Sequence, residues 1–425
     1  PFWYYFLFPA FFIGRDPYIL VVFAVLFFHL SILSVFLYLR RHNQSKLAFI
    51  FSYLLLISPA SFLTTRYSFN ANAIFYFVPP LITLLYLRTS FFWTGLLVGI
   101  CLQLQSAFAP VIFIFALLWY VTNQIGKRNL FLFLVGFLLT LTPQLFSEII
   151  RHFPMTKAVV SEVFGQTNYL NEKLSLGNLL FDRLNHLRFI FSQSLYLNYK
   201  VAIGLFLFNF ILLIRTKKHQ FTLLFLLVLI IFYFLFPHYL KDWYLYGAIP
   251  FIIFSFSQGL SQVDNRNILI FFILVMTLIS FKSMINYLIQ VSKSPSQDSS
   301  NLKNQKKVVD IVYQQSDGKP FEVYVYQPSV YDYPYQYLFW YLGNEKYQLL
   351  PSKISYLPDI PEYIRDNNLF WPKNPQPPQK TFLIIQHDTD NSQREIDWRN
   401  KFNQAINLFP TRYGITIEEV LLSHD

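Results

Sequence analysis

The stretch RYSFNAN, residues 66 to 72, places an arginine and two asparagines between two apolar segments. A guanidinium in such a position either extends toward lipid headgroups or pairs with a phosphate through two parallel hydrogen bonds. Asn70 and Asn72 either cap the helix that follows or present amide groups to a polar ligand. The residue types around Arg66 therefore indicate either membrane anchoring or phosphate binding.

A second set of polar residues lies in FPHYLKDWYLY, residues 236 to 246, between two further apolar segments. His238 and Lys241 are cationic candidates for holding a phosphate, and Asp242 lies beside them. The alternative is a belt of aromatic residues at the membrane surface with a Lys–Asp pair that has no function.

Glu148, Arg151 and His152 follow another apolar segment. They either cap and anchor the end of a helix or form one wall of a cleft for an acceptor molecule. Asp16 differs from them because it precedes Pro17 and an apolar run, a pattern typical of a helix N-terminus. We therefore expect Asp16 to be a cap and not a catalytic acid.

The composition of the 425 residues indicates a membrane protein, with 54% hydrophobic, 20% aromatic and only 13% charged residues. The formal net charge of +11 does not indicate nucleic-acid binding, because the basic residues are dispersed among short connections. Cys101 is the single cysteine, so no intramolecular disulfide can form. The sequence shows neither metal-ligand spacing nor a nucleotide-binding glycine loop, so we expect no metal and no cofactor, and ATP-driven transport is unsupported.

Apolar runs separated by polar breaks predict about ten membrane-spanning helices, some shorter than the roughly 20 residues that a bilayer requires. The predicted spans are residues 18–39, 47–63, 73–87, 91–103, 107–121, 130–146, 201–214, 221–236, 245–256 and 268–289. The expected fold class is therefore an α-helical polytopic membrane protein.

The basic residues of the connections predict which ends of these helices face the cytoplasm. One set of alternate connections contains Arg40, Arg41, Lys46, Arg88, Lys127, Arg128, Arg215, Lys217, Lys218 and Arg266. The opposite connections contain only Arg15, Arg66 and Lys241, so the first set is predicted to be cytoplasmic. Residues 1–17, the Arg66 loop, the segment 147–200 and the region after residue 290 are then expected outside.

The composition also divides the chain into domains. Residues 1–290 are expected to form the transmembrane domain, in which the outer segment 147–200 includes the amphipathic piece NLLFDRLNHLRFIFSQSL that would lie along the interface. Residues 291–302 are rich in Ser, Asn and Lys and indicate a linker. Residues 303–425 predict a small extracytoplasmic α/β domain with helices at 303–315, 335–343 and 392–406 and strands at 321–327, 381–386 and 415–422.

RYSFNANAIFYF resembles the arginine, aromatic, Asn-Pro-Asn loop of bacterial GT-C membrane glycosyltransferases, relatives of protein O-mannosyltransferases and aminoarabinose lipid A transferases. Arg66, Tyr67, Asn70 and Asn72 match this loop, whereas Ala71 replaces the proline. Further resemblances lie in PFWYYFLFPAFFIGRDP at residues 1–17, TPQLFSEIIRHFPMTKAV at 142–159 and YDYPYQYLFWYLG at 331–343.

The resemblance implies that a sugar is transferred, with inversion, from a polyprenyl-phosphate carrier to an unknown acceptor at the outer face of the cell membrane. Arg66, His238 and Lys241 would bind the donor phosphate. The cleft would be lined by Tyr67, Asn70, Glu148, Arg151, His152 and Asp242. The resemblance further implies that the catalytic carboxylate lies on a loop that precedes residue 1.

Two alternatives remain open from the sequence. A lipid-linked glycan ligase or polymerase would differ mainly in its acceptor. A flippase or transporter would share the many spans, but ionisable residues are then expected in the middle of the spans, whereas the candidates here cluster near the predicted outer ends. The expected partners are thus a polyprenyl-phosphate sugar, an acceptor and membrane lipids, without nucleic acid.

Overall fold

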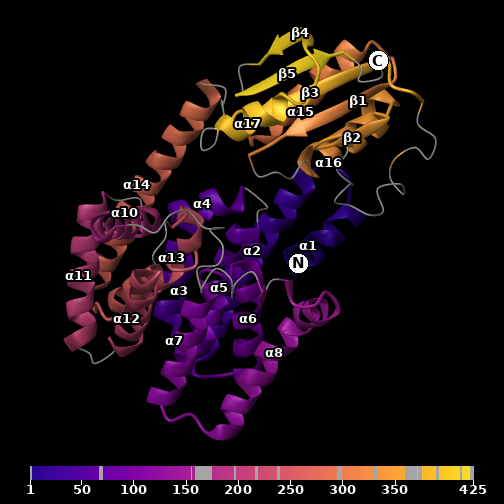
Figure 1. Ribbon diagram of the computed structural model, residues 1–425. Helices are drawn as coiled ribbons and strands as arrows, with labels where there is room; N and C mark the ends of the chain where they lie inside the picture. The colour runs from indigo at the N-terminus through magenta and orange to yellow at the C-terminus, as the bar shows by residue number, and fades with distance from the viewer. Residues whose placement is uncertain are drawn as a thin grey trace. The chain divides into compact units, whose positions relative to one another are not determined.

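The structure is a computed structural model that describes residues 2–66, 70–154, 156–157, 175–195, 198–215, 219–236, 240–293, 299–328, 333–358, 371, 376–388, 392–411 and 414–421. The chain divides into two compact units, Pro1–Asn286 and Tyr287–Asp425. In Figure 1 the described part of the first unit is helical, and the second contains a sheet with helices packed on it.

The first unit is built from helices, and the predicted apolar segments fall mainly within them. They are α1 (Phe2–Leu7), η1 (Phe8–Phe12), α2 (Tyr18–Arg41), α3 (Ser45–Ile57), α4 (Pro59–Thr65), α5 (Asn70–Leu87), α6 (Phe91–Leu104), α7 (Ala109–Thr122), α8 (Lys127–Ile150), α10 (Leu176–Leu195), α11 (Tyr199–Arg215), α12 (Gln220–Leu235), η2 (Asp242–Leu245), α13 (Ile249–Leu260) and α14 (Arg266–Lys293). Helix α14 begins in this unit and continues to Lys293. Its last three residues therefore overlap the linker that the sequence predicted over 291–302.

The segment predicted as one span at 47–63 is divided at Ser58 into α3 and α4, whose axes differ by 58°. Ser58 is extended, with ψ of 147°, because the ring of Pro59 disfavours helical geometry in the preceding residue. The Ser58 hydroxyl then accepts a hydrogen bond from the backbone N–H of Ser61 at 3.2 Å and so caps α4. This bend determines the direction of the short helix that ends at Arg66.

Helix α13 forms the centre of the first unit. Its residues from Ile249 to Gly259 are all buried, and it packs against α3, α5, α10, α11 and α12. In contrast, α2, α8 and α14 have many large apolar side chains exposed, such as Leu33, Leu138 and Phe281. An apolar surface of this kind is suited to lipid and not to water.

Within the described residues, α2, α8 and residues 266–289 of α14 are long and apolar enough to cross a membrane. The number rises from 3 to 5 if the bent pairs α3–α4 and α10–α11 each form one span. Helices α5, α6, α7 and α12 are apolar but shorter. The total of about ten spans therefore stays a prediction.

The second unit contains a five-stranded sheet in the order β2-β1-β3-β5-β4. Its elements are α15 (Leu302–Ser316), β1 (Phe321–Tyr326), α16 (Tyr333–Leu342), the π-helical turn η3 (Gly343–Tyr347), β2 (Lys353–Ser355), β3 (Lys380–Gln386), α17 (Ser392–Arg399), β4 (Ala405–Pro410) and β5 (Ile415–Val420). Strand β1 is parallel to β2 and β3, whereas β5 is antiparallel to β3 and β4.

Alternate residues of the central strands face opposite sides of this sheet. Val323 and Val325 belong to a core with α15 and α16, and Tyr324 and Tyr326 belong to a second core with Trp398 of α17. The sheet thus has helices on both faces, in agreement with the α/β composition predicted from the sequence (Figure 1).

One local prediction in the second unit was wrong. The helix predicted over 392–406 ends at Arg399, and the residues from Ala405 onward form β4, because pairing with β5 satisfies their backbone groups. The helix predicted over 335–343 corresponds to α16, which ends at Leu342. The chain continues through η3, and Gln348, with φ of 52°, ends this turn.

Candidate functional site

Arg66 occupies the C-cap position of α4, at the end of the bent α3–α4 pair. Its guanidinium carbon lies 5.2 Å from the centre of the Phe62 ring, one turn earlier on the same helix. This cation–π contact holds the charged group beside the end of the helix. Tyr67 and His238 lie outside the described residues, and of Asn70 only the backbone is described, as the first residue of α5.

Four elements meet at this end of the first unit, which we call the Arg66 end: the end of α4, the start of α5, helix α10 and η2. Helix α10 contacts both α4 and η2, and α5 contacts both α4 and η2. Arg66, Asn70 and the pair Lys241–Asp242 therefore belong to elements that pack together, although they are far apart in the sequence.

Lys241 and Asp242 form the start of η2 and are both exposed. The Lys241 ammonium lies 5.4 Å from the centre of the Trp243 ring. The Gln105 side chain donates a hydrogen bond to the Trp243 carbonyl, and the Tyr233 hydroxyl donates one to the Tyr244 carbonyl at 3.0 Å. Buried partners thus fix the backbone of η2 while its charged side chains stay accessible.

Helix α10 supplies charged residues that the sequence analysis did not select. Arg183 is only 3% exposed and donates hydrogen bonds from Nε to the Tyr233 carbonyl at 2.8 Å and from Nη2 to the Phe236 carbonyl. It also pairs with Asp182. The guanidinium therefore supplies donors to carbonyls at the end of α12, which the helix itself leaves without partners.

His186 connects α10 to η2 across the same end. Its Nδ1 lies 2.8 Å from the Asp182 carbonyl oxygen, and its Nε2 lies 3.5 Å from Asp242 Oδ1. Asp242 remains 61% exposed at its side chain. The spacing of Asp182 and His186, four residues apart on an amphipathic helix, was the signal in the sequence, because it places both on one helical face.

Glu148, Arg151 and His152 lie at the end of α8. Glu148 is buried, and its Oε2 accepts hydrogen bonds from the backbone N–H of Thr156 at 2.9 Å and from its hydroxyl at 2.8 Å. Arg151 and His152 are exposed, and His152 adopts a left-handed φ of 58°. This geometry supports the capping interpretation of Glu148, and its role in an acceptor cleft stays a prediction.

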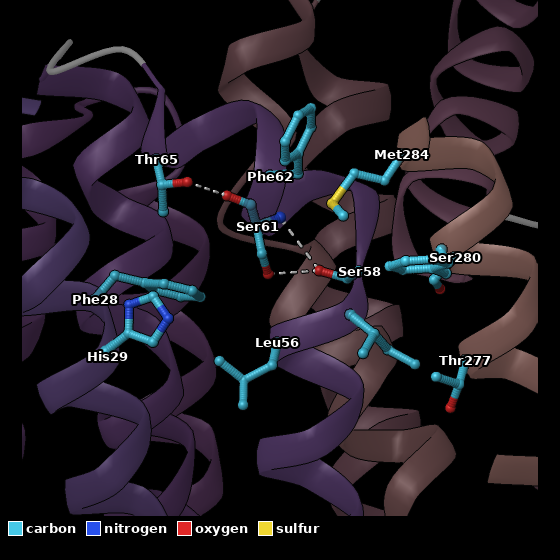
Figure 2. A pocket seen from close by; sticks show the side chains of 12 residues that line it. Phe28, His29, Leu56, Ser58, Ser61, Phe62, Thr65, Thr277, Ser280 and Met284 are labelled. Carbon is cyan, nitrogen blue, oxygen red and sulfur yellow. Dashed lines mark hydrogen bonds between the residues drawn. The ribbon is translucent and has the colours of Figure 1, made fainter. Parts of the chain in front are cut away.

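A cavity of about 340 Å³ lies beside α4 and is bounded by α2, α3, α4 and α14 (Figure 2). The side chains that line it are mostly apolar or hydroxyl-bearing: Phe28, His29, Leu56, Ile57, Ser58, Ser61, Phe62, Thr65, Thr277, Ser280, Phe281 and Met284. Thr65 immediately precedes Arg66, so the cavity adjoins the last turn of α4. Its walls are suited to a hydrocarbon chain.

The hydroxyl groups of α4 are largely satisfied within the helix. The Ser58 and Ser61 hydroxyls lie 2.8 Å apart, and Thr65 Oγ1 donates to the Ser61 carbonyl at 2.7 Å (Figure 2). They therefore add little polarity to this wall of the cavity. Among the described residues no cluster of His, Cys, Asp and Glu could hold a metal ion.

Neither a family model nor a curated protein sequence matches this chain. Among solved structures, the chain is similar to ArnT from Cupriavidus metallidurans bound to undecaprenyl phosphate, with a TM-score of 0.57 and 10% identity over 100% of this chain and 88% of that chain. The apo state of the same protein gives a TM-score of 0.59 and 10% identity over 99% of this chain and 87% of that chain. The chain therefore has the GT-C fold of ArnT.

Proposed function

We propose that the protein transfers a sugar, with inversion, from a polyprenyl-phosphate carrier to an acceptor at the outer face of the membrane. The observation that carries this proposal is the fold shared along the whole chain with ArnT, which was solved with undecaprenyl phosphate bound. The second unit would then lie outside the cytoplasm, as the distribution of basic residues predicts.

The Arg66 end offers the groups that such a donor requires. A departing lipid phosphate needs fixed positive charge, and Arg66 and Lys241 lie on elements that pack together there. The apolar cavity beside α4 is suited to the isoprenoid chain, and Arg66 directly follows its lining residue Thr65. We assign His238 the same phosphate-binding role by its position in the sequence.

We further propose that Tyr67, Asn70, Glu148, Arg151, His152 and Asp242 line the cleft for the acceptor. Asp242 is the best supported of these, because it is exposed and connected to α10 through His186. Glu148 is less suited to proton transfer, since Thr156 already donates two hydrogen bonds to its carboxylate. The role of general base is not assigned to any of them.

The test of this function is the turnover of a labelled polyprenyl-phosphate sugar in membranes with Arg66→Lys and Arg66→Ala. We expect Arg66→Ala to lower turnover about 10²-fold or more, because a donor to the developing phosphate charge is lost. Arg66→Lys should recover only part of the loss, because lysine keeps the charge but cannot form the bidentate pair.

The matched control is Arg15→Lys and Arg15→Ala, at another arginine of the predicted outer connections. Turnover that is equal in all four variants and the unaltered protein would remove Arg66 from the site. Consumption of the donor also distinguishes a transferase from a flippase, since a flippase would move the labelled lipid between leaflets and leave it intact.

A further inference from the structure

A second cavity, of about 320 Å³ and with a mixed polar and aromatic lining, lies at the other end of α5. It is lined by Gln44, Tyr86, Leu87, Arg88, Trp119, Asn123, Gln220, Phe221 and Gln258. We call this the Arg88 end, formed by the ends of α5, α7 and α13 and the starts of α3 and α12. Helix α5 has 18 residues, so the cavity lies about 27 Å along its axis from the Arg66 end.

The wall of this cavity is held in place by a chain of hydrogen bonds. Arg88 Nη1 donates to Asn123 Oδ1 at 2.8 Å, and Asn123 Nδ2 donates to the Trp119 carbonyl at 2.8 Å. The Trp119 indole N–H donates to the Leu85 carbonyl at 2.9 Å. Arg88 is thus held in the lining of the cavity while it stays exposed, and a guanidinium has five N–H donors, so it retains capacity for an anion.

Gln258 lines the cavity from the central helix α13 and is only 1% exposed. Its Oε1 is buried and has no hydrogen-bond partner within the described part of the chain. Leaving such an acceptor unsatisfied has a free-energy cost, because the group loses its hydrogen bonds to water on burial. A bound molecule that donates a hydrogen bond to Gln258 would remove this cost.

The ligand must therefore bring two features at once: an anionic oxygen for Arg88 and a hydroxyl or ammonium donor for Gln258. A phosphodiester with a hydroxylated or amino headgroup has both. The aromatic rings of Tyr86, Trp119 and Phe221 supply apolar walls. Exposed apolar side chains follow the lining residues on two helices, namely Val121 on α7 and Leu223 on α12, and these can contact acyl chains.

We propose that the Arg88 end binds the headgroup of an anionic glycerophospholipid, phosphatidylglycerol being the best chemical match. Basic residues flank the lining residue Gln44, namely Arg40, Arg41 and Lys46, and such a cluster attracts anionic lipid headgroups. The site is separate from the Arg66 end and independent of the proposed sugar transfer.

The test measures binding of short-chain phosphatidylglycerol, short-chain phosphatidylcholine and sn-glycerol 3-phosphate to the purified full chain in detergent. Phosphatidylcholine carries the phosphate but no headgroup donor, and glycerol phosphate lacks the acyl chains. We expect saturable binding of phosphatidylglycerol at least about tenfold tighter than that of the other two, since only phosphatidylglycerol brings both the headgroup donor and the acyl chains.

Three variants locate the site. Arg88→Ala should weaken the binding of phosphatidylglycerol about tenfold. Gln258→Met should remove the preference for phosphatidylglycerol over phosphatidylcholine. Arg128→Ala, an exposed arginine near the same end, is the matched control and should leave binding unchanged. Equal loss in Arg88→Ala and Arg128→Ala would overturn the proposal in favour of unspecific charge attraction. Equal affinity of the unaltered protein for the two lipids would also overturn it, whether or not Gln258→Met folds.

Discussion

Arg183 illustrates how one side chain can organise the Arg66 end. It lies on α10 and donates to the carbonyls of Tyr233 and Phe236 at the end of α12, while Asp182 balances its charge. A buried guanidinium is tolerated because its donors reach acceptors, and removing one partner leaves the others unsatisfied. Arg183 thus fixes the backbone at the end of α12, which precedes the Lys241 segment in the chain.

We predict that Arg183→Met lowers the free energy of unfolding by about 1–3 kcal/mol, because the carbonyls of α12 lose their donors. Thermal unfolding of the full chain in detergent measures the effect. Arg188→Met is the matched control on the same helix, since the Arg188 guanidinium is exposed and lies over the Tyr199 ring at 5.1 Å. Equal melting temperatures for the two variants would contradict the role of Arg183.

The polar residues that follow β3 have protein partners. His387 and Asp388 are the first two of them. The Tyr326 hydroxyl donates to Asp388 Oδ2 at 2.8 Å, and Arg394 donates to the same carboxylate at 2.6 Å. Burial raises the pKa of Tyr326 to about 12, so this hydroxyl remains a donor throughout the physiological range.

At the scale of elements, α6 packs closely against α8. A Cβ atom on Gly95 would collide with the Phe133 carbonyl, one on Gly99 with the Thr140 side chain, and one on Gly136 with the Phe92 carbonyl. Small residues spaced four apart allow such approach between apolar helices. The glycines of FFWTGLLVGICLQL therefore mark the face by which α6 meets its neighbour.

We predict that Gly95→Ala lowers the unfolding free energy by about 1–3 kcal/mol, because the collision involves backbone atoms that cannot move aside. Gly204→Ala is the control within another helix, α11, where no atom lies within 4 Å of the added Cβ. That change should be neutral or stabilising by up to about 1 kcal/mol, since alanine favours helices. Equal destabilisation by both substitutions would refute close packing at Gly95.

At the scale of the whole molecule, the two units have separate apolar cores. The core of the first unit is built around α13, and that of the second lies on both faces of the five-stranded sheet. The second unit begins its own hydrogen-bonding network before residue 303, the boundary predicted from the sequence. Asn301 caps α15 by accepting from the Lys303 N–H at 3.0 Å, and the Ser299 carbonyl accepts from Gln386.

We predict that residues 299–425 expressed alone give a soluble folded α/β protein, and that residues 303–425 are less stable by about 1 kcal/mol because the cap of α15 is lost. Chemical unfolding followed by circular dichroism compares the two fragments. Asn301→Ala in the longer fragment should reproduce most of the difference. A narrow spread of amide proton chemical shifts for residues 299–425, typical of an unfolded chain, would show that the unit cannot fold by itself.

The sequence by itself determined the local features. Apolar runs specified the helices, and short alternating or apolar runs specified β1, β3 and β5. Asp16, which was expected to be a cap, accepts a hydrogen bond from the Tyr18 N–H at 2.9 Å, although Pro17 is the residue at the N-cap of α2. These features depend on residues close together in the chain, so their pattern is readable directly. The resemblance around Arg66 similarly indicated the GT-C fold, which the likeness to ArnT supports.

Only the tertiary structure decided which distant residues meet. It brings the elements of Arg66 and Lys241 together, adds Arg183 and His186 from α10, and leaves Gln258 buried beside a cavity at the other end. It also converts residues 405–410 into a strand, because their partner β5 supplies the hydrogen bonds. Such outcomes depend on packing between segments far apart in the sequence, and the pattern of a single segment contains no information about its neighbours in space.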